Sequence, residues 1–80
     1  MVVVWDEQSI HHMLVVNGCR AIGLDEIEEV LSDPTATRRR LRGGRRMYRG
    51  RTTAGRRLTV VAEVVEHRWL MPRTAWETTR

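Results

Sequence analysis

The sequence of 80 residues predicts one α+β domain, in which two N-terminal helices pack on a four- to five-stranded antiparallel sheet. The element order is β-α-α-β-β-β-β, because apolar residues recur at helical spacing before Pro34 and alternate with polar residues after it. A chain of this length builds a single thin core, so residues 1–80 form one domain. Its hydrophobic fraction of 41% is ordinary for a globular protein.

The first half of the chain carries one short strand and two helices. Val2–Trp5 is β-branched and aromatic, which is typical of a strand. Asp6 is a candidate N-cap for a helix that ends at Asn17-Gly18, since both of these residues tolerate a left-handed conformation. A second helix begins at Leu24 and ends at Ser32-Asp33-Pro34, because the residue before a proline is disfavoured in a helix. We expect the carboxylates of this second helix to form a solvated face.

The second half of the chain predicts a meander of four strands. We expect these strands over Thr35–Leu41, Arg45–Arg51, Arg57–Val65 and Arg68–Thr74. Gly43-Gly44 predicts a tight hairpin turn. Apolar residues on both faces of Arg57–Val65 favour a place inside the sheet. Pro72 lacks a backbone donor, so the last strand is expected at an edge or near its end.

Charge divides the chain into an acidic and a basic half. All 14 residues counted as lysine or arginine are arginines. Residues 1–33 contain seven carboxylates and one arginine, whereas residues 34–80 contain 13 arginines and three glutamates. A GC-rich genome accounts for the missing lysines but not for this clustering. Guanidinium groups bind phosphate through two parallel hydrogen bonds, so RNA is the favoured partner. A solvated surface or an acidic protein partner is the alternative.

The strand over Arg45–Arg51 is the centre of the predicted binding surface. Alternation places Arg45, Met47, Arg49 and Arg51 on one face, and Arg46 and Tyr48 on the other. Such a face binds phosphates, and Tyr48 or Trp69 is available to stack on bases. The RNA-binding candidates are Arg38, Arg40, Arg42, Arg45 and Arg73. His12 is a candidate for proton transfer, although an exposed or capping histidine is its simpler interpretation.

Several kinds of site are not expected from the sequence. The single cysteine, Cys19, allows no intramolecular disulfide, which favours a reducing cytoplasm. No apolar run reaches the roughly 18–20 residues of a membrane span. Met1–Trp5 lacks the basic residues of a signal peptide. The histidines match no metal-ligand spacing, so we expect neither a metal nor a cofactor.

A series of short motifs runs along nearly the whole chain. They are Trp5-Asp6-Glu7, Asp33-Pro34, Arg46…Gly50-Arg51-Thr52, Gly55-Arg56-Arg57-Leu58, Val60-Val61 and Thr74-Ala75. As an ordered set, they resemble the BrnT family of bacterial toxins. The resemblance implies a fold similar to RelE-type ribonucleases and the role of a toxin in a type II toxin–antitoxin system. It also implies a metal-independent endoribonuclease that cuts mRNA and is neutralised by a cognate antitoxin.

The resemblance further implies which residues form the catalytic site. Arg51 stands at the arginine of the family's Gly-Arg-Thr motif, and Arg46 at a basic position of the same strand. Arg51, with either Arg46 or Arg49, is expected to stabilise the charge that develops when a ribose 2′-hydroxyl attacks the adjacent phosphate. His12 or Tyr48 is expected to transfer protons.

The sequence departs from the family pattern at two places. Val16-Asn17-Gly18 stands where the family has Lys-His-Gly, and Trp76 stands where it has an arginine. Arg73 is the candidate to replace that arginine. The alternative hypothesis is therefore a toxin-like module that binds nucleic acid or an antitoxin without catalysis.

Overall fold

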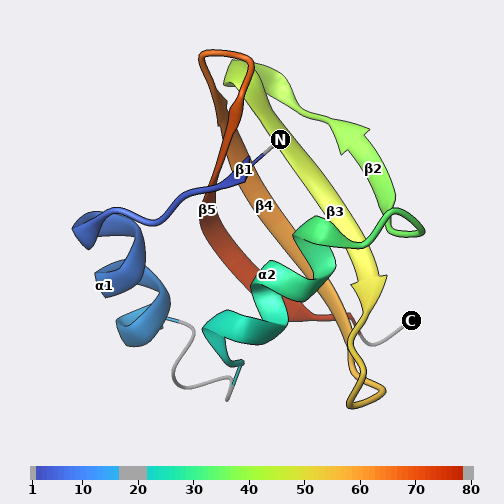
Figure 1. The fold of residues 1–80 in the computed structure, drawn as a ribbon. Helices are drawn as coiled ribbons and strands as arrows, with labels where there is room; N and C mark the ends of the chain where they lie inside the picture. The colour runs from blue at the N-terminus through green and yellow to red at the C-terminus, as the bar shows by residue number, and fades with distance from the viewer. Residues whose placement is uncertain (1, 17–21, 79–80) are drawn as a thin grey trace.

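The computed structural model describes residues 2–16 and 22–78. Within these residues, two helices, five strands and one 3-10 turn follow the predicted order (Figure 1). They are β1 (Val2–Val3), α1 (Glu7–Val16), α2 (Leu24–Ser32), β2 (Thr37–Arg40), η2 (Arg42–Gly44), β3 (Arg45–Arg51), β4 (Arg57–Val65) and β5 (Trp69–Glu77). The α+β class is confirmed, while the predicted helix end at Asn17-Gly18 lies outside the described residues.

The five strands form one sheet in the order β1-β5-β4-β3-β2. Strands β2 to β5 make the predicted antiparallel meander, with β4 inside it. The prediction of a wholly antiparallel sheet is wrong at β1, where Val2 pairs with Trp69 in parallel. Two helices separate β1 from the meander, and such a long crossover lets a strand return in the same direction. Pro72 lies beyond this short pairing, where β5 has a strand on one side only.

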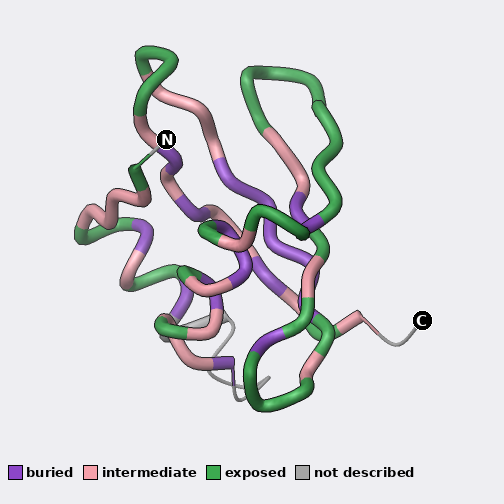
Figure 2. Tube along the Cα trace, turned by 45° about the vertical axis from the view of Figure 1, so that its right-hand side comes forward, coloured by how far each residue is buried: buried purple, intermediate pink, exposed green. Residues whose placement is uncertain are grey.

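The core lies between α2 and the middle of the sheet. Ile27, Val30 and Leu31 form the buried face of α2. They belong to one cluster with residues of β3 and β4, among them Tyr48 and Val60. Figure 2 shows buried residues along the centre of the sheet and exposed residues along β2 and the hairpin turns. The helix α1 lies alongside β5 and adds Met13 to the cluster (Figure 1).

The expectation that the carboxylates of α2 form a solvated face is wrong in part, because three of them accept hydrogen bonds from other segments. Glu26 accepts hydrogen bonds from the backbone N–H of Gly23 and from Arg56, both at 3.2 Å. Glu28 accepts one from the indole N–H of Trp5. Glu29 accepts one from the Thr53 hydroxyl at 3.2 Å. These contacts hold α2 against the segment between β1 and α1 and against the turn between β3 and β4.

Asp6 caps α1, as the sequence predicts. Its carboxylate accepts a hydrogen bond of 2.6 Å from the backbone N–H of Ser9. This bond is the main reason why the pKa of Asp6 lies below its ordinary value. The capped helix therefore starts at a defined point, which positions the residues on its next turn.

Gly50 sets how closely α2 approaches β3. A Cβ atom there would lie 3.3 Å from both the Ala36 Cβ and a Val30 methyl carbon. We therefore expect Gly50→Val to lower the free energy of unfolding by about 1–3 kcal/mol, through overpacking. Arg49→Ala, the exposed neighbour, should change it by less than about 0.5 kcal/mol. Urea unfolding measures both, and equal effects would contradict this account of the helix–sheet contact.

Candidate nucleic-acid interface

The register of the sheet sorts the arginines of the hairpin onto two faces. Arg46 pairs with Arg40 and with Ala62 and shares the face of α2. Arg45, Arg49 and Arg51 lie on the opposite face, as alternation predicts. Arg39 lies on this second face because it pairs with Met47. The second face therefore carries a stripe of arginines along β3 and its neighbours, in which Met47 lies between Arg45 and Arg49 and Glu63 lies opposite Arg45.

Most of these arginines have no acidic partner. The ion pairs among the described residues join Arg56 to Glu26 and Glu77, and Arg73 to Glu63. The other ten described arginines form no ion pair with a described carboxylate: Arg38, Arg39, Arg40, Arg42, Arg45, Arg46, Arg49, Arg51, Arg57 and Arg68. Positive charge of this density attracts a polyanion and holds it through phosphate contacts.

One groove brings together candidates from three separate elements. It has a volume of about 450 Å³, and its lining includes His12 of α1, Arg45 of β3 and Arg73 of β5. Val61 and Thr74 form part of its floor. We call it the His12 groove. An imidazole that transfers protons and guanidinium groups that stabilise charge are the components of phosphodiester cleavage.

Arg73 enters this groove because β5 is irregular. Val61 pairs with Thr74, but Ala62 pairs with Pro72, so Arg73 is an extra residue in β5. A β-bulge of this kind changes the direction of a side chain. Glu63 then holds the guanidinium, accepting a hydrogen bond of 2.9 Å from Arg73 Nε. The sequence offers no signal for this bulge, because strand alternation gives no account of a shift in register.

The predicted catalytic residues do not all lie at one place. Arg49 and Arg51 line a second hollow with Arg57, at the opposite end of β3 from Arg45. The two ends of an extended strand of this length lie about 20 Å apart. Arg51 therefore lies far along β3 from Arg45, which lines the His12 groove.

Tyr48 does not occupy the place that base stacking needs. Its side chain is only 2% exposed and is part of the core cluster. The expectation of an exposed stacking ring is wrong. Alternation along the strand predicted which face Tyr48 lies on, but it could not predict that α2 packs over that face. Arg38 is exposed beside it, and Arg42 is exposed in η2.

The described residues contain neither a candidate metal site nor a candidate membrane span. No three of their His, Cys, Asp and Glu side chains lie close enough to hold a metal ion. Neither of their helices is long and apolar enough to cross a bilayer.

The fold is similar to that of a solved ribonuclease toxin. The crystal structure of BrnT from Brucella abortus matches with a TM-score of 0.70 and 17% identical residues. The match covers 100% of this chain and 99% of that chain. No protein-family model and no curated protein sequence matches the chain. The BrnT-like fold predicted from the sequence is therefore confirmed by structure.

The unpaired arginines predict a steep dependence of RNA binding on salt. About five arginine–phosphate contacts give a slope near −3.5 in log K against log salt, at about −0.7 each for a single strand. Fluorescence anisotropy with a labelled oligoribonucleotide measures this slope. The double variant Arg49→Ala/Arg51→Ala should reduce it by about 1.4, while Arg68→Ala, in the turn before β5, should leave it nearly unchanged. Association that is independent of salt would refute the electrostatic interpretation.

Proposed function

We propose that this protein is the toxin of a type II toxin–antitoxin system and that it cuts messenger RNA without a metal ion. The observation that carries the proposal is the His12 groove, in which an exposed histidine meets Arg45 and Arg73. The shared fold with a ribonuclease toxin supports it. The stripe of unpaired arginines along β3 supports binding of the RNA strand.

In the proposed reaction, the 2′-hydroxyl of a ribose attacks the adjacent phosphorus. His12 accepts the hydroxyl proton as the new P–O bond forms. The P–O5′ bond then breaks, and the leaving oxygen takes a proton from solvent. Arg45 and Arg73 stabilise the negative charge that builds up on the phosphoryl oxygens. The products are a 2′,3′-cyclic phosphate and a free 5′-hydroxyl.

Arg49 and Arg51 have a different role in this proposal. They lie toward the far end of β3 from Arg45, so they hold the RNA strand away from the scissile bond. The resemblance to the BrnT family instead implies a catalytic role for Arg51. The two assignments differ in whether Arg51 affects the chemical step or only the binding of RNA.

A non-catalytic binding module is the second candidate function. The observation that favours it is the ion pair between Arg73 and Glu63, which already neutralises one cation of the groove. Such a module would bind RNA or an antitoxin through the same arginines and would leave RNA intact.

A cleavage assay in excess chelator tests the proposed enzyme. We expect wild-type protein to cut a long single-stranded RNA, and His12→Ala to lower kcat by about 10²–10⁴. Arg51→Ala should raise KM with kcat nearly unchanged. Arg68→Ala removes the same charge outside the groove and serves as the control. A fall of about 10²–10³ in kcat for Arg51→Ala would instead support the family assignment. RNA that is bound but never cut would support the non-catalytic module.

A cognate antitoxin should stabilise this protein strongly. A thin core and unpaired arginines limit the stability of the free chain, and a ligand that binds only the folded state adds to it. At about 100 times its dissociation constant, an antitoxin adds about 2.7 kcal/mol, which raises Tm by about 10–20 °C for a domain of this size. Differential scanning calorimetry of the free and bound protein measures this shift. Recovery of no small protein partner from the native host would argue against the toxin role.

A further inference from the structure

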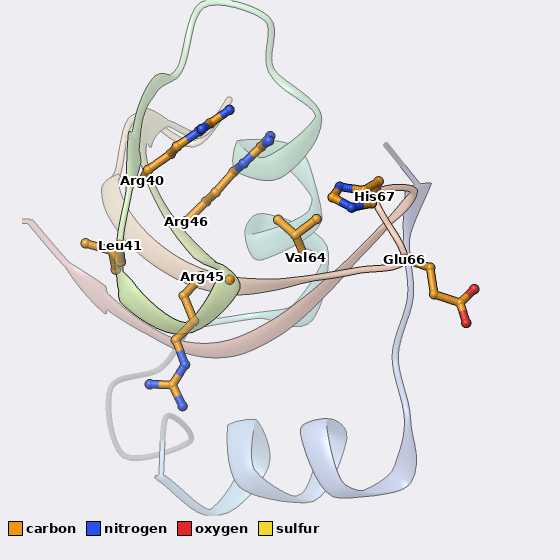
Figure 3. A pocket seen from close by; sticks show the side chains of 8 residues that line it. Arg40, Leu41, Arg45, Arg46, Val64, Glu66 and His67 are labelled. Atoms are coloured by element: carbon orange, nitrogen blue, oxygen red, sulfur yellow. The ribbon is translucent and has the colours of Figure 1, made fainter.

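A hollow separate from the His12 groove and from the one lined by Arg49 and Arg51 lies at the end of the sheet where the β2–β3 and β4–β5 turns come together. It has a volume of about 280 Å³ and is lined by side chains that include Arg40, Arg46, His67, Val64 and Leu41 (Figure 3). Arg46 and Arg40 lie on the α2 face of the sheet, opposite to the stripe of arginines that includes Arg45 and Arg49. We call it the His67 pocket. The proposed cleavage reaction makes no use of it.

Two arginines of the pocket are arranged to bind one anion. Arg40 and Arg46 are direct partners across β2 and β3, and such partners lie about 5 Å apart. Figure 3 shows their side chains running in the same direction from neighbouring strands. Neither forms an ion pair with a described carboxylate. Two adjacent guanidinium groups that point the same way can bind a single phosphate together.

The turn between β4 and β5 brings an imidazole to the same pocket. Glu66 and His67 both have positive φ, at 52° and 57°, and the backbone N–H of Arg68 bonds to the carbonyl of Val65. Asparagine and glycine are the usual residues of such a turn, so this pair holds an unfavourable conformation. In Figure 3 the His67 ring lies on the side of the arginines, across Val64, while the Glu66 carboxylate points away.

Arg45 connects this pocket to the His12 groove. It is a lining residue of both hollows. Figure 3 shows its side chain pointing to the other side of the sheet from Arg40 and Arg46. The two hollows are therefore back to back at one end of β3. An RNA strand that leaves the groove around this end of the sheet reaches the pocket directly.

We propose that Arg40, Arg46 and His67 form a second phosphate-binding site, which holds a phosphodiester of single-stranded RNA next to the segment in the His12 groove. This inference rests on the proposed function. Val64 and Leu41 supply an apolar wall against which a base packs. RNA fits better than an acidic protein segment, because two neighbouring guanidinium groups point the same way and Arg45 lines both this pocket and the His12 groove, as successive phosphates of one strand require.

Binding of a hexanucleotide with 2′-O-methyl riboses tests this site, since that probe lacks the attacking hydroxyl and stays intact. We expect Arg46→Ala to weaken binding about tenfold, the effect of losing one charge-assisted contact. His67→Asn should weaken it less, about threefold, and asparagine tolerates the left-handed turn, so this variant folds. Arg68→Ala is the control: it removes one charge, as Arg46→Ala does, and it lies in the same turn as His67. It should weaken binding less than about twofold. Thermal unfolding of each variant confirms that it is folded.

Nuclear magnetic resonance of the imidazole groups locates the bound probe. The His67 signals should shift as the hexanucleotide is added to wild-type protein, and Arg46→Ala should abolish that shift. Unmoved His67 signals at saturation, or equal losses of affinity for Arg46→Ala and Arg68→Ala, overturn the inference. A shift caused by an acidic peptide but not by RNA overturns it in favour of protein docking.

The same samples separate this inference from the proposed function. If wild-type protein cuts unmodified RNA and the His67 signals do not shift, the proposed function stands and the second phosphate site is refuted. If the His67 signals shift and no RNA is cut, the phosphate site is supported and the enzymatic function is refuted. Both readouts use the full chain.

Discussion

The burial of one face of α2 on β3 and β4 is the contact on which the rest of the structure depends. The core is thin, and Ile27, Val30 and Leu31 supply the helical side of it. The absence of a side chain at Gly50 lets Val30 approach β3. Because α2 takes the middle of one sheet face, most of the arginines lie elsewhere: on the opposite face, or beyond the ends of the helix.

The separation of charge follows from the same contact. Three acidic residues of α2 have fixed partners, since Glu26 binds Arg56, Glu28 binds Trp5, and Glu29 binds Thr53. These carboxylates are thereby kept away from the stripe on β3, where Arg45, Arg49 and Arg51 form no ion pair with a described carboxylate, although Glu63 lies opposite Arg45. The surface along β3 is therefore strongly basic, although the net charge of the whole chain is only +4. Mutual repulsion along that surface opposes folding, and an anionic partner removes it.

Both hollows at the end of β3 combine a histidine with arginines from different elements. In the His12 groove, a bulge directs Arg73 and Glu63 holds it. In the His67 pocket, an unfavourable turn directs the imidazole. In both hollows, an irregularity of the backbone sets the direction of a side chain: the bulge for Arg73 and the left-handed turn for His67. Arg45 lines both hollows, which links the proposed chemistry to the proposed binding of one RNA strand.

The helices, the strands and the faces of the strands were predictable from local patterns in the sequence. The change of period at Pro34 predicted two helices and then a meander, Asp6 predicted an N-cap, and alternation put Arg45, Arg49 and Arg51 on one face. Each of these signals is local, because it depends on residues a few positions apart. The parallel pairing of β1, the burial of Tyr48 and the place of His12 and Arg73 in one groove are known only from the folded chain. These depend on which distant segments pack together, and periodicity along the chain carries no information about that choice.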